Sequence, residues 1–316
     1  MSGQLVIERI GPGASIQDLG RTGGMGLGLS RGGAVDRHAL LRGSALLGNP
    51  VGSAALEMTV GGGRFRVTTT TRVAMTGADL NASLNGTRLE TGATYVMKAD
   101  DVLNVGAASG GVYGYLHFAG GLTTDEELGG RGRHGIGGLG RDLSDKDVLP
   151  LGIDPEPKAA PMRLNAPGGN RQAIRVVPGP QTDLFPDDVL AVFEATTFTR
   201  SPKGNRQGVK MDFEGRPFAT DAQLGQVSDF ISEGDIQMTG DGTPFVLLAE
   251  CQTMGGYPRI GTVIPMDLPR VAQALPGEEL KFAFATLADV EDTWKSDEDL
   301  YREFRKARSP RTRDPR

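Results

Sequence analysis

The sequence predicts a mainly β protein with two barrel-like domains and only a few short helices. Glycine supplies 47 of the 316 residues, about twice the usual share, which indicates many tight turns and bulges between strands. Short apolar runs recur along the chain, each bounded by glycine, aspartate or asparagine, as is typical of strands. Helix signals with recognisable ends occur at three places, apart from one short helix expected in the charged C-terminal segment. Short helices among many strands favour antiparallel, barrel-like sheets.

Two kinds of pattern predict the strands. Short apolar runs with the strand pattern occupy residues 4–10, 63–69, 72–77, 94–98, 112–121, 173–179 and 245–250. Elsewhere an acidic turn leads directly into an alternating apolar run, at residues 98–106, 143–152 and 275–283. Because this second device occurs in both halves of the chain, we expect related barrel corners in the two domains.

The three expected helices have recognisable ends. They lie within residues 35–50, 185–195 and 266–277. In the first, Asp36 is the expected N-cap and Gly48 begins the stop. The second has Pro186 in its first turn, where proline is favoured. The third has Asp267 as its expected cap.

A linker rich in proline and polar residues is expected at residues 154–172. It separates an N-terminal barrel domain at residues 1–160 from a C-terminal barrel domain at residues 161–292. Residues 293–316 are strongly charged and are expected to be a disordered tail beyond one short helix. A solvated tail is favoured over a binding site for an anionic partner.

The bulk numbers exclude several classes of protein. The formal charge of −5 gives no reason to expect nucleic-acid binding. A single cysteine excludes an intrachain disulfide framework. No signal peptide and no apolar stretch long enough to span a membrane are apparent, so a cytoplasmic protein is expected.

Cofactor motifs are sparse. There is no Walker-type phosphate loop. Residues 130–135 fit G-x-G-x-x-G, but no helical pattern follows, which argues against a dinucleotide site. The arginines of this loop, Arg131, Arg133 and Arg141, suit either a weak anion-binding loop or a plain surface loop.

No metal site is predicted from the histidines. His38, His117 and His134 are far apart and lack ligand spacing. His117 lies within an expected strand and is interpreted as a packed residue, whereas His134 is the better but weak candidate for acid–base work.

The segment 251–260, CQTMGGYPRI, carries the chain's only cysteine. A nucleophilic thiolate needs a base or a positive environment, but Cys251 follows Glu250 and has no histidine nearby in sequence. A small buried cysteine is therefore the favoured interpretation.

The residues after this cysteine suit a ligand that bears an amide or a carboxylate. They offer amide, hydroxyl and guanidinium groups around a glycine pair that lets backbone approach a ligand: Gln252, Thr253, Gly255, Gly256, Tyr257 and Arg259. A hairpin turn with an exposed tyrosine and arginine explains the same composition equally well.

Several long segments, in one order, resemble a known family. They are PGASIQDLGRTG, SRGGAVDRHALLRGSALLGNP, ALEMTVGGGRFRV, AMTGADLNASLNG, YLHFAGGL, RVVPGPQTDLF, SEGDIQMTGDGTPFVLLAECQTMGGYPRIGTVIPMDL and AQALPGEELKF. The chain is similar up to about residue 285 to KipA-type proteins, also described as allophanate hydrolase subunit 2 or as the C component of 5-oxoprolinase. The resemblance implies two cyclophilin-like β-barrel domains in one chain.

The same resemblance implies partners and three possible roles. A KipI-type protein (the B component) and a LamB/YcsF-type protein (the A component) accompany it in an ATP-dependent 5-oxoprolinase, which opens a small cyclic amide. Similar sequences form the carboxyltransferase part of biotin-dependent urea carboxylases, although this chain shows no A-M-K-M biotin-attachment motif. A third role is non-catalytic, as an antagonist of a KipI-type inhibitor of a sensor kinase. Lactam hydrolysis is the favoured role.

All these substrates contain an N–C=O unit, so preorganised donors aimed at an oxygen are expected. We hypothesise that Asp79 positions or deprotonates an amide nitrogen, while Arg259 holds a carboxylate. The groups expected around the rest of the substrate are Gln237, Gln252 and Thr253 on the carbonyl, with Tyr257 packed against the ligand. ATP is expected to bind at the level of the complex, and biotin belongs only to the carboxyltransferase alternative.

The chain departs from the family pattern at three places. Relatives commonly have an aspartate–arginine pair where Glu250 and Cys251 stand, so a positive charge beside the loop is lost. The second threonine of the loop is Met254 here. Residues 202–215 keep the arginine-x-glycine core at Arg206 and Gly208 but differ from the usual version, which contains an aromatic residue. An altered substrate or a different partner is compatible with these changes.

Overall fold

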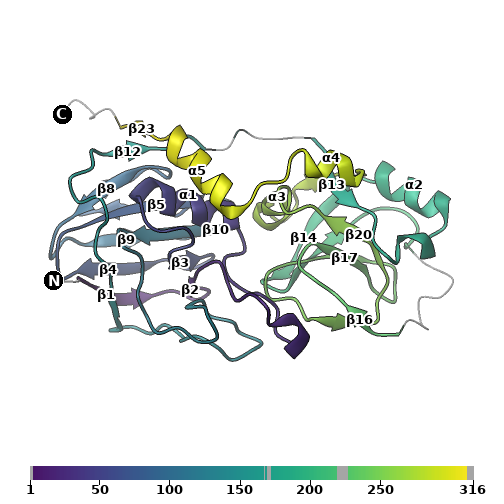
Figure 1. Ribbon diagram of the computed structural model, residues 1–316, viewed down its shortest axis with the longest axis horizontal. Helices are drawn as coiled ribbons and strands as arrows, with labels where there is room; N and C mark the ends of the chain where they lie inside the picture. Colours follow the sequence, from purple (N-terminus) through teal and green to yellow (C-terminus); the bar gives the residue numbers. More distant parts are fainter. Residues whose placement is uncertain (1–2, 167, 169–171, 219–226, 312–316) are drawn as a thin grey trace. The chain divides into compact units, whose positions relative to one another are not determined.

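The computed structural model describes residues 3–166, 168, 172–218 and 227–311, and the chain forms two compact units (Figure 1). The first unit comprises Met1–Arg21, Gly32–Gly168 and Lys295–Arg316, and the second comprises Thr22–Arg31 and Gly169–Trp294. The sequence suggested a single division near residue 160. The structure instead places a short N-terminal excursion in the second unit and the C-terminal segment in the first.

Two antiparallel sheets build the first unit. The six-stranded sheet has the order β11 (Val148–Pro150), β1 (Gln4–Ile10), β4 (Gly63–Val67), β9 (Leu103–Val105), β6 (Ser83–Leu84), β7 (Thr87–Arg88). The five-stranded sheet has the order β2 (Ser15–Gln17), β3 (Ala55–Met58), β10 (Ser109–Phe118), β5 (Thr71–Asp79), β8 (Thr94–Met97). The mainly β class is thereby confirmed, and the acidic turns lead into β9 and β11 as expected.

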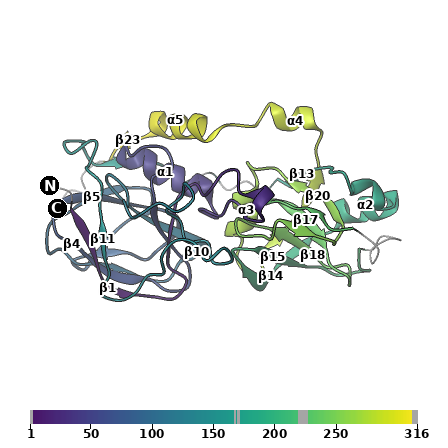
Figure 2. The same cartoon turned by 60° about the horizontal axis from the view of Figure 1, so that its bottom comes forward.

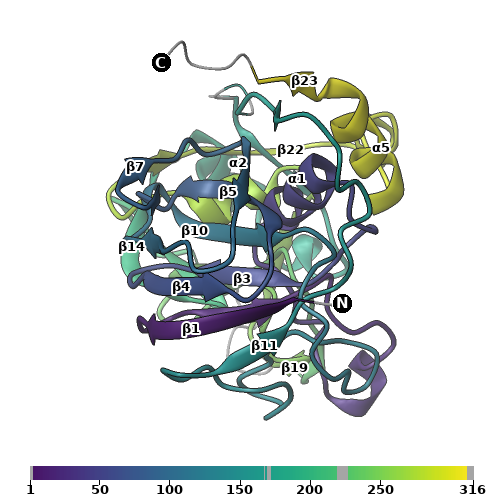
Figure 3. The same cartoon turned by 90° about the vertical axis from the view of Figure 1, so that its left-hand side faces the viewer.

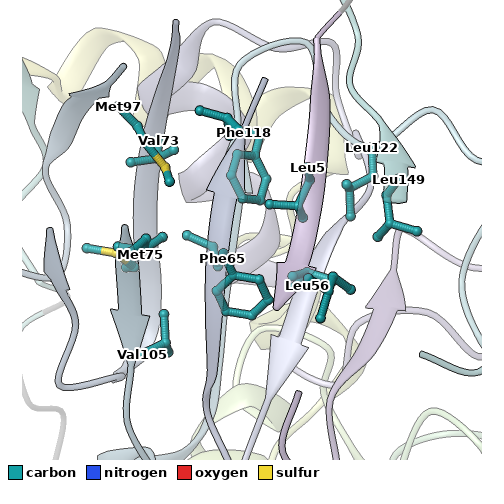
Figure 4. Close-up of a cluster of buried hydrophobic side chains, with 14 of the residues drawn as sticks. Leu5, Leu56, Phe65, Val73, Met75, Met97, Val105, Phe118, Leu122 and Leu149 are labelled. Carbon is teal, nitrogen blue, oxygen red and sulfur yellow. The ribbon is translucent and has the colours of Figure 1, made fainter. Parts of the chain in front are cut away.

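The core of the first unit lies between these sheets (Figure 4). Side chains alternate between the two faces of a strand, so Val73 and Met75 of β5 enter this core while Ala74 joins a second cluster. The labelled side chains of the core come from both sheets and, for Leu122, from the segment after β10: Leu5, Leu56, Phe65, Val73, Met75, Met97, Val105, Phe118, Leu122 and Leu149.

Helix α1 (Arg37–Leu47) covers the other face of the five-stranded sheet. Its ends follow the sequence prediction, since the Asp36 carboxylate accepts from the Ala39 N–H at 2.9 Å and Gly48 ends it with φ of 73°. The Thr76 hydroxyl donates to the Ala39 carbonyl at 2.7 Å. A Cβ at Gly43 would lie 2.1 Å from Nε2 of His117, so only glycine lets the helix approach this imidazole.

The C-terminal segment is ordered where the structure describes it, unlike the expected disordered tail. Helix α5 (Asp297–Ala307) lies alongside α1, and β23 (Ser309–Pro310) pairs with β12 (Met162–Arg163) (Figures 1 and 3). Glu156 accepts from Arg305 at 2.6 Å and from Arg308 at 3.2 Å, and both contacts lower the pKa of this carboxyl. Because these charges are paired within the unit, their density does not keep the segment unfolded.

One eight-stranded sheet builds the second unit. Its order is β21 (Glu279–Leu280), β14 (Phe198–Asn205), β15 (Gly208–Asp212), β18 (Pro244–Leu247), β17 (Asp235–Met238), β20 (Arg259–Val263), β13 (Ile174–Val177), β22 (Phe282–Phe284). Figure 2 shows the strands from β14 to β13 following one another in this order. The end strands β21 and β22 are consecutive in the chain, so the sheet curls into a nearly closed barrel.

Three helices accompany this barrel: α2 (Asp187–Ala195), α3 (Leu268–Gln273) and α4 (Leu287–Glu291). Helices α2 and α3 lie where the sequence predicts them. Asp267 is the N-cap residue of α3 as expected, but its side chain makes no capping hydrogen bond, because its carboxylate binds the guanidinium of Arg175 at 2.9 and 3.0 Å. Within the described ranges, no helix has the length and apolar character that crossing a membrane requires.

The buried imidazole of His117 predicts a pH-dependent stability. The Thr76 hydroxyl has one proton, which goes to Ala39, so Nε2 of His117 must donate to Thr76 at 2.9 Å. Burial lowers the pKa of His117 from 6.5 to about 3. The unfolded chain therefore takes up the proton first, and stability that is complete above pH 6.5 is lost as the pH falls toward 3.

We expect this single group to reduce the free energy of unfolding by up to about 1.4 kcal/mol per pH unit in that window. His117→Gln keeps a neutral donor without a titrating ring, so its stability should fall less steeply. Urea unfolding of both proteins at several pH values between 7 and 4 measures the difference. Equal slopes would show that His117 is not buried as a neutral ring.

Candidate functional site

A cavity of about 370 Å³ opens on the second unit. Its walls come from the β14–β15 hairpin, from β17 and β18, and from the loop that follows β18. They are formed by Lys203, Gly204, Asn205, Gln207, Gly208, Gln237, Thr239, Phe245, Leu247, Cys251, Gln252 and Tyr257. The lining is rich in amide groups and contains no carboxylate.

Strand register sets the floor of this cavity. Gln237 of β17 lies opposite Phe245 of β18, and Leu247 of β18 lies opposite Gly208 of β15. Opposed residues share a face of the sheet, and alternate residues along a strand do so too. The neighbouring residues Ile236 and Val246 are fully buried on the other face. The barrel thus presents polar and apolar side chains together on its cavity face.

The loop after β18 is anchored on the β14–β15 hairpin. Leu248 donates its N–H to the Gln207 carbonyl at 2.9 Å, and Glu250 donates its N–H to the Arg206 carbonyl at 2.8 Å. The Glu250 carboxylate and the Arg206 guanidinium form an ion pair at 2.6 Å. The negative charge of Glu250 is therefore neutralised by the retained arginine of the hairpin.

Cys251 lies beneath this loop with 3% of its surface exposed. Its side chain packs against Ile231 and Leu247. Burial, together with the charges of Glu233 and Asp235, raises the pKa of the thiol to about 12. The thiol is thus uncharged at neutral pH, which agrees with its interpretation as a small buried residue rather than a nucleophile.

Arg259 is engaged inside the protein, which differs from its expected role in holding a substrate carboxylate. Its guanidinium donates to Gln181 at 3.3 Å, to Asp235 at 3.3 Å and to Asp229. The side chain is 12% exposed. These contacts tie β20 to the short strand β16 (Asp229–Phe230), so a positioning role in the protein suits this residue better.

The rest of the expected loop divides between cavity and interior. Gln252 and the half-exposed Tyr257 line the cavity, together with Gln237 from β17. Thr253 is buried, and its carbonyl accepts from the Ile231 N–H at 3.1 Å. Gly255 belongs to the short strand β19 (Met254–Gly255), which pairs with β16. Gly256 follows it, directly before Tyr257.

Asp79 belongs to the first unit, at the end of β5. Its carboxylate accepts from Arg88 at 2.6 Å and from the Asn81 N–H at 2.9 Å. These contacts give it a local role in closing a turn. Asp79 and the cavity thus belong to different units.

The arginine-rich loop of the first unit has its charges balanced. Arg131 pairs with Glu126 at 2.9 Å, Arg133 with Asp142 at 2.7 Å, and Arg141 with Asp147 at 2.7 Å. Paired guanidinium groups attract a further anion weakly, so the plain-loop interpretation is favoured. Across the described part of the chain, no three His, Cys, Asp or Glu side chains are grouped to hold a metal ion.

Sequence reasoning missed the hairpin side of the cavity. Lys203, Asn205 and Gln207 were not singled out, although the segment was noted for its arginine and glycine. Phe245 was assigned to a strand without a role in a site. An available signal was the run of polar residues at 203–207 between two apolar strands, which marks a hairpin tip.

Comparison with known proteins places this geometry in a family. Residues 27–284 match the model of the carboxyltransferase domain, subdomains A and B. The C component of the 5-oxoprolinase of Escherichia coli K12 is 34% identical over 95% of this chain and 96% of its own. The protein of the same name from Haemophilus influenzae is 32% identical over 88% of this chain and 90% of its own.

A solved structure supports the same assignment. The urea amidolyase of K. lactis superposes with a TM-score of 0.84 at 26% identity, and the match covers 95% of this chain. This chain corresponds to only 20% of that larger protein. These relatives are all named as enzymes or parts of enzymes. The chain belongs to the carboxyltransferase-domain family that includes the C components of 5-oxoprolinases.

Proposed function

We propose that this protein is the C component of an ATP-dependent 5-oxoprolinase, which hydrolyses the lactam of 5-oxoproline to glutamate. The observation that carries the proposal is the 34% identity to the C component of a 5-oxoprolinase, over almost the full length of both chains. The protein acts with a KipI-type B component and a LamB/YcsF-type A component. Its contribution is to hold and polarise the cyclic amide.

The chemistry of the cavity supports this role. Lactam opening breaks the ring C–N bond, with water supplying hydroxide to the carbonyl carbon and a proton to the nitrogen. Negative charge builds on the carbonyl oxygen during this step, so amide N–H donors fixed around that oxygen lower the barrier. Gln237 and Gln252 supply such donors on a rigid strand and on an anchored loop.

We do not assign ATP to this cavity. Its triphosphate carries several negative charges, whereas the lining offers one cation, Lys203, and no phosphate loop. We therefore assign nucleotide binding to the partner proteins. In the complex, ATP would supply the energy of lactam opening, and this chain would orient the amide.

A carboxyltransferase function is the second candidate. The family model is named for that activity, and the similar urea amidolyase structure contains the same fold. The ureido ring of biotin has an N–C=O group that the amide donors of the cavity suit. This candidate requires a biotin carrier from another protein and predicts dependence on bicarbonate.

Reconstitution tests the proposed function. The chain is mixed with its KipI-type and LamB/YcsF-type partners, and release of ADP and glutamate is followed with 5-oxoproline as substrate. We expect turnover only when all three proteins are present. Avidin should leave it unchanged, because biotin takes no part.

The other roles give different results in the same assay. Avidin-sensitive, bicarbonate-dependent turnover of urea would favour the carboxyltransferase. A tight complex with the KipI-type protein, without any substrate-dependent ATP hydrolysis, would favour the inhibitor antagonist. Either result would overturn the lactam proposal.

The proposed reaction uses no thiolate from this chain. Since burial raises the pKa of Cys251 to about 12, the single thiol should react slowly with Ellman's reagent at pH 8 and fully only after denaturation. Cys251→Ser should retain turnover within about twofold, because the side chain packs rather than reacts. Loss of all turnover in a folded Cys251→Ser protein would assign the thiol a catalytic role.

A further inference from the structure

The cavity of the second unit contains an unsatisfied donor. Gln237 is 4% exposed, and its Nε2 has no hydrogen-bond partner among the described residues. An unpaired buried amide costs about 1–3 kcal/mol, so such groups nearly always have a protein, water or ligand partner. Because Gln237 also lines the cavity, the missing acceptor is one that a bound molecule can supply.

Gly255 keeps the space beside this donor free. A Cβ at position 255 would lie 2.8 Å from Nε2 of Gln237, 3.1 Å from Cδ1 of Ile231 and 3.5 Å from Nε2 of Gln252. Two amide nitrogens and one methyl group thus border the direction in which a side chain would leave the loop. An acceptor oxygen approaching along it meets donors from two different elements, which is the arrangement that stabilises a carbonyl oxygen.

The charge of the cavity indicates the second group of the ligand. Lys203 is its only charged lining residue, and its side chain is exposed. The nearby Arg206 is paired with Glu250, and Lys210 is paired with Asp212 at 2.8 Å. Among the described residues, no ion pair joins Lys203 to a carboxylate, although the contact with Lys210 and, to a smaller extent, the charge of Lys203 lower the pKa of Asp212. The hairpin therefore offers one ammonium group to an anion at the cavity.

We propose that this cavity binds a small organic monoanion through two contacts. Its carbonyl oxygen accepts from the amides of Gln237 and Gln252 beside Gly255, and its carboxylate pairs with Lys203. Phe245 and Leu247 contact the apolar body of the ligand. This assignment rests on the proposed function and adds the location of the substrate site to it. It also predicts selectivity for anions, since a neutral molecule such as urea leaves Lys203 unpaired.

Direct binding to the full chain tests this assignment, because every lining residue belongs to the second unit. The probes are 5-oxoproline, its uncharged counterpart 2-pyrrolidinone, and urea, followed by ligand-observed NMR titration. We expect 5-oxoproline to bind at least about tenfold more tightly than 2-pyrrolidinone, the difference that one charge-assisted contact provides. Urea should bind most weakly.

Four variants separate the two contacts. Gln237→Met removes the amide at similar volume. Gly255→Ala adds a Cβ that displaces the Gln237 amide, and alanine is tolerated by the backbone there because φ of Gly255 is not in the left-handed region. Both should weaken all three probes. Lys203→Met should weaken only 5-oxoproline, by about tenfold, and abolish its advantage over 2-pyrrolidinone. Lys281→Met is the matched control, because this exposed lysine of the same unit lies outside the cavity.

Unchanged 5-oxoproline affinity in folded Lys203→Met and Gln237→Met proteins would overturn the assignment, as would no binding to the unmodified chain. Turnover of the reconstituted complex distinguishes this failure from failure of the proposed function. If the complex hydrolyses 5-oxoproline with an unchanged KM in both variants, the function stands and the site is wrong. If the cavity discriminates as expected but the complex does not hydrolyse 5-oxoproline, the site stands and the function is wrong.

Discussion

The second unit depends on one constraint, which is that the strands at the two ends of its sheet are separated only by Lys281. Because the chain passes directly from one end of the sheet to the other, the barrel nearly closes and its middle strands have little freedom of register. That register puts Gln237 opposite Phe245 and Gly208 opposite Leu247. The floor of the cavity is therefore set by the barrel, and loops supply only its rim.

Buried polar groups in this chain serve two purposes. His117 has its partner in Thr76, and that contact joins the sheet of the first unit to α1. Gln237 has a donor without a partner among the described residues, although an apolar residue at this position would stabilise the barrel more. The unpaired donor lowers the stability of the barrel, but it is already in place for a ligand. A preorganised donor on a rigid strand needs no rearrangement when the ligand binds.

The sequence predicted the fold more completely than the site. Strand alternation, the Asp36 cap and the acidic turns are local signals, and the structure confirms them. Pairing between distant residues is not local: nothing near Arg259 in sequence indicates that Asp229 and Asp235 would occupy its guanidinium. For the same reason, the sequence did not predict the ion pairs that order α5. It also did not predict that Lys203 lines the cavity, because that position depends on the pairing of the hairpin. Gln252 and Tyr257 were found from the polar and glycine-rich composition of their loop, whereas Gln237 was found because a resemblance pointed to its segment.

The residues that depart from the family pattern at positions 250 and 251 change the charge around the cavity. Glu250 stands where relatives commonly have aspartate, and the retained Arg206 neutralises it across the hairpin. Cys251 stands where they commonly have arginine, and a buried neutral thiol contributes no charge to the cavity. The positive charge lost at 251 leaves Lys203 as the only cation in the lining. Recognition of an anion thus depends on one exposed lysine at the hairpin rather than on a buried arginine, so its contribution to affinity should decline as ionic strength rises.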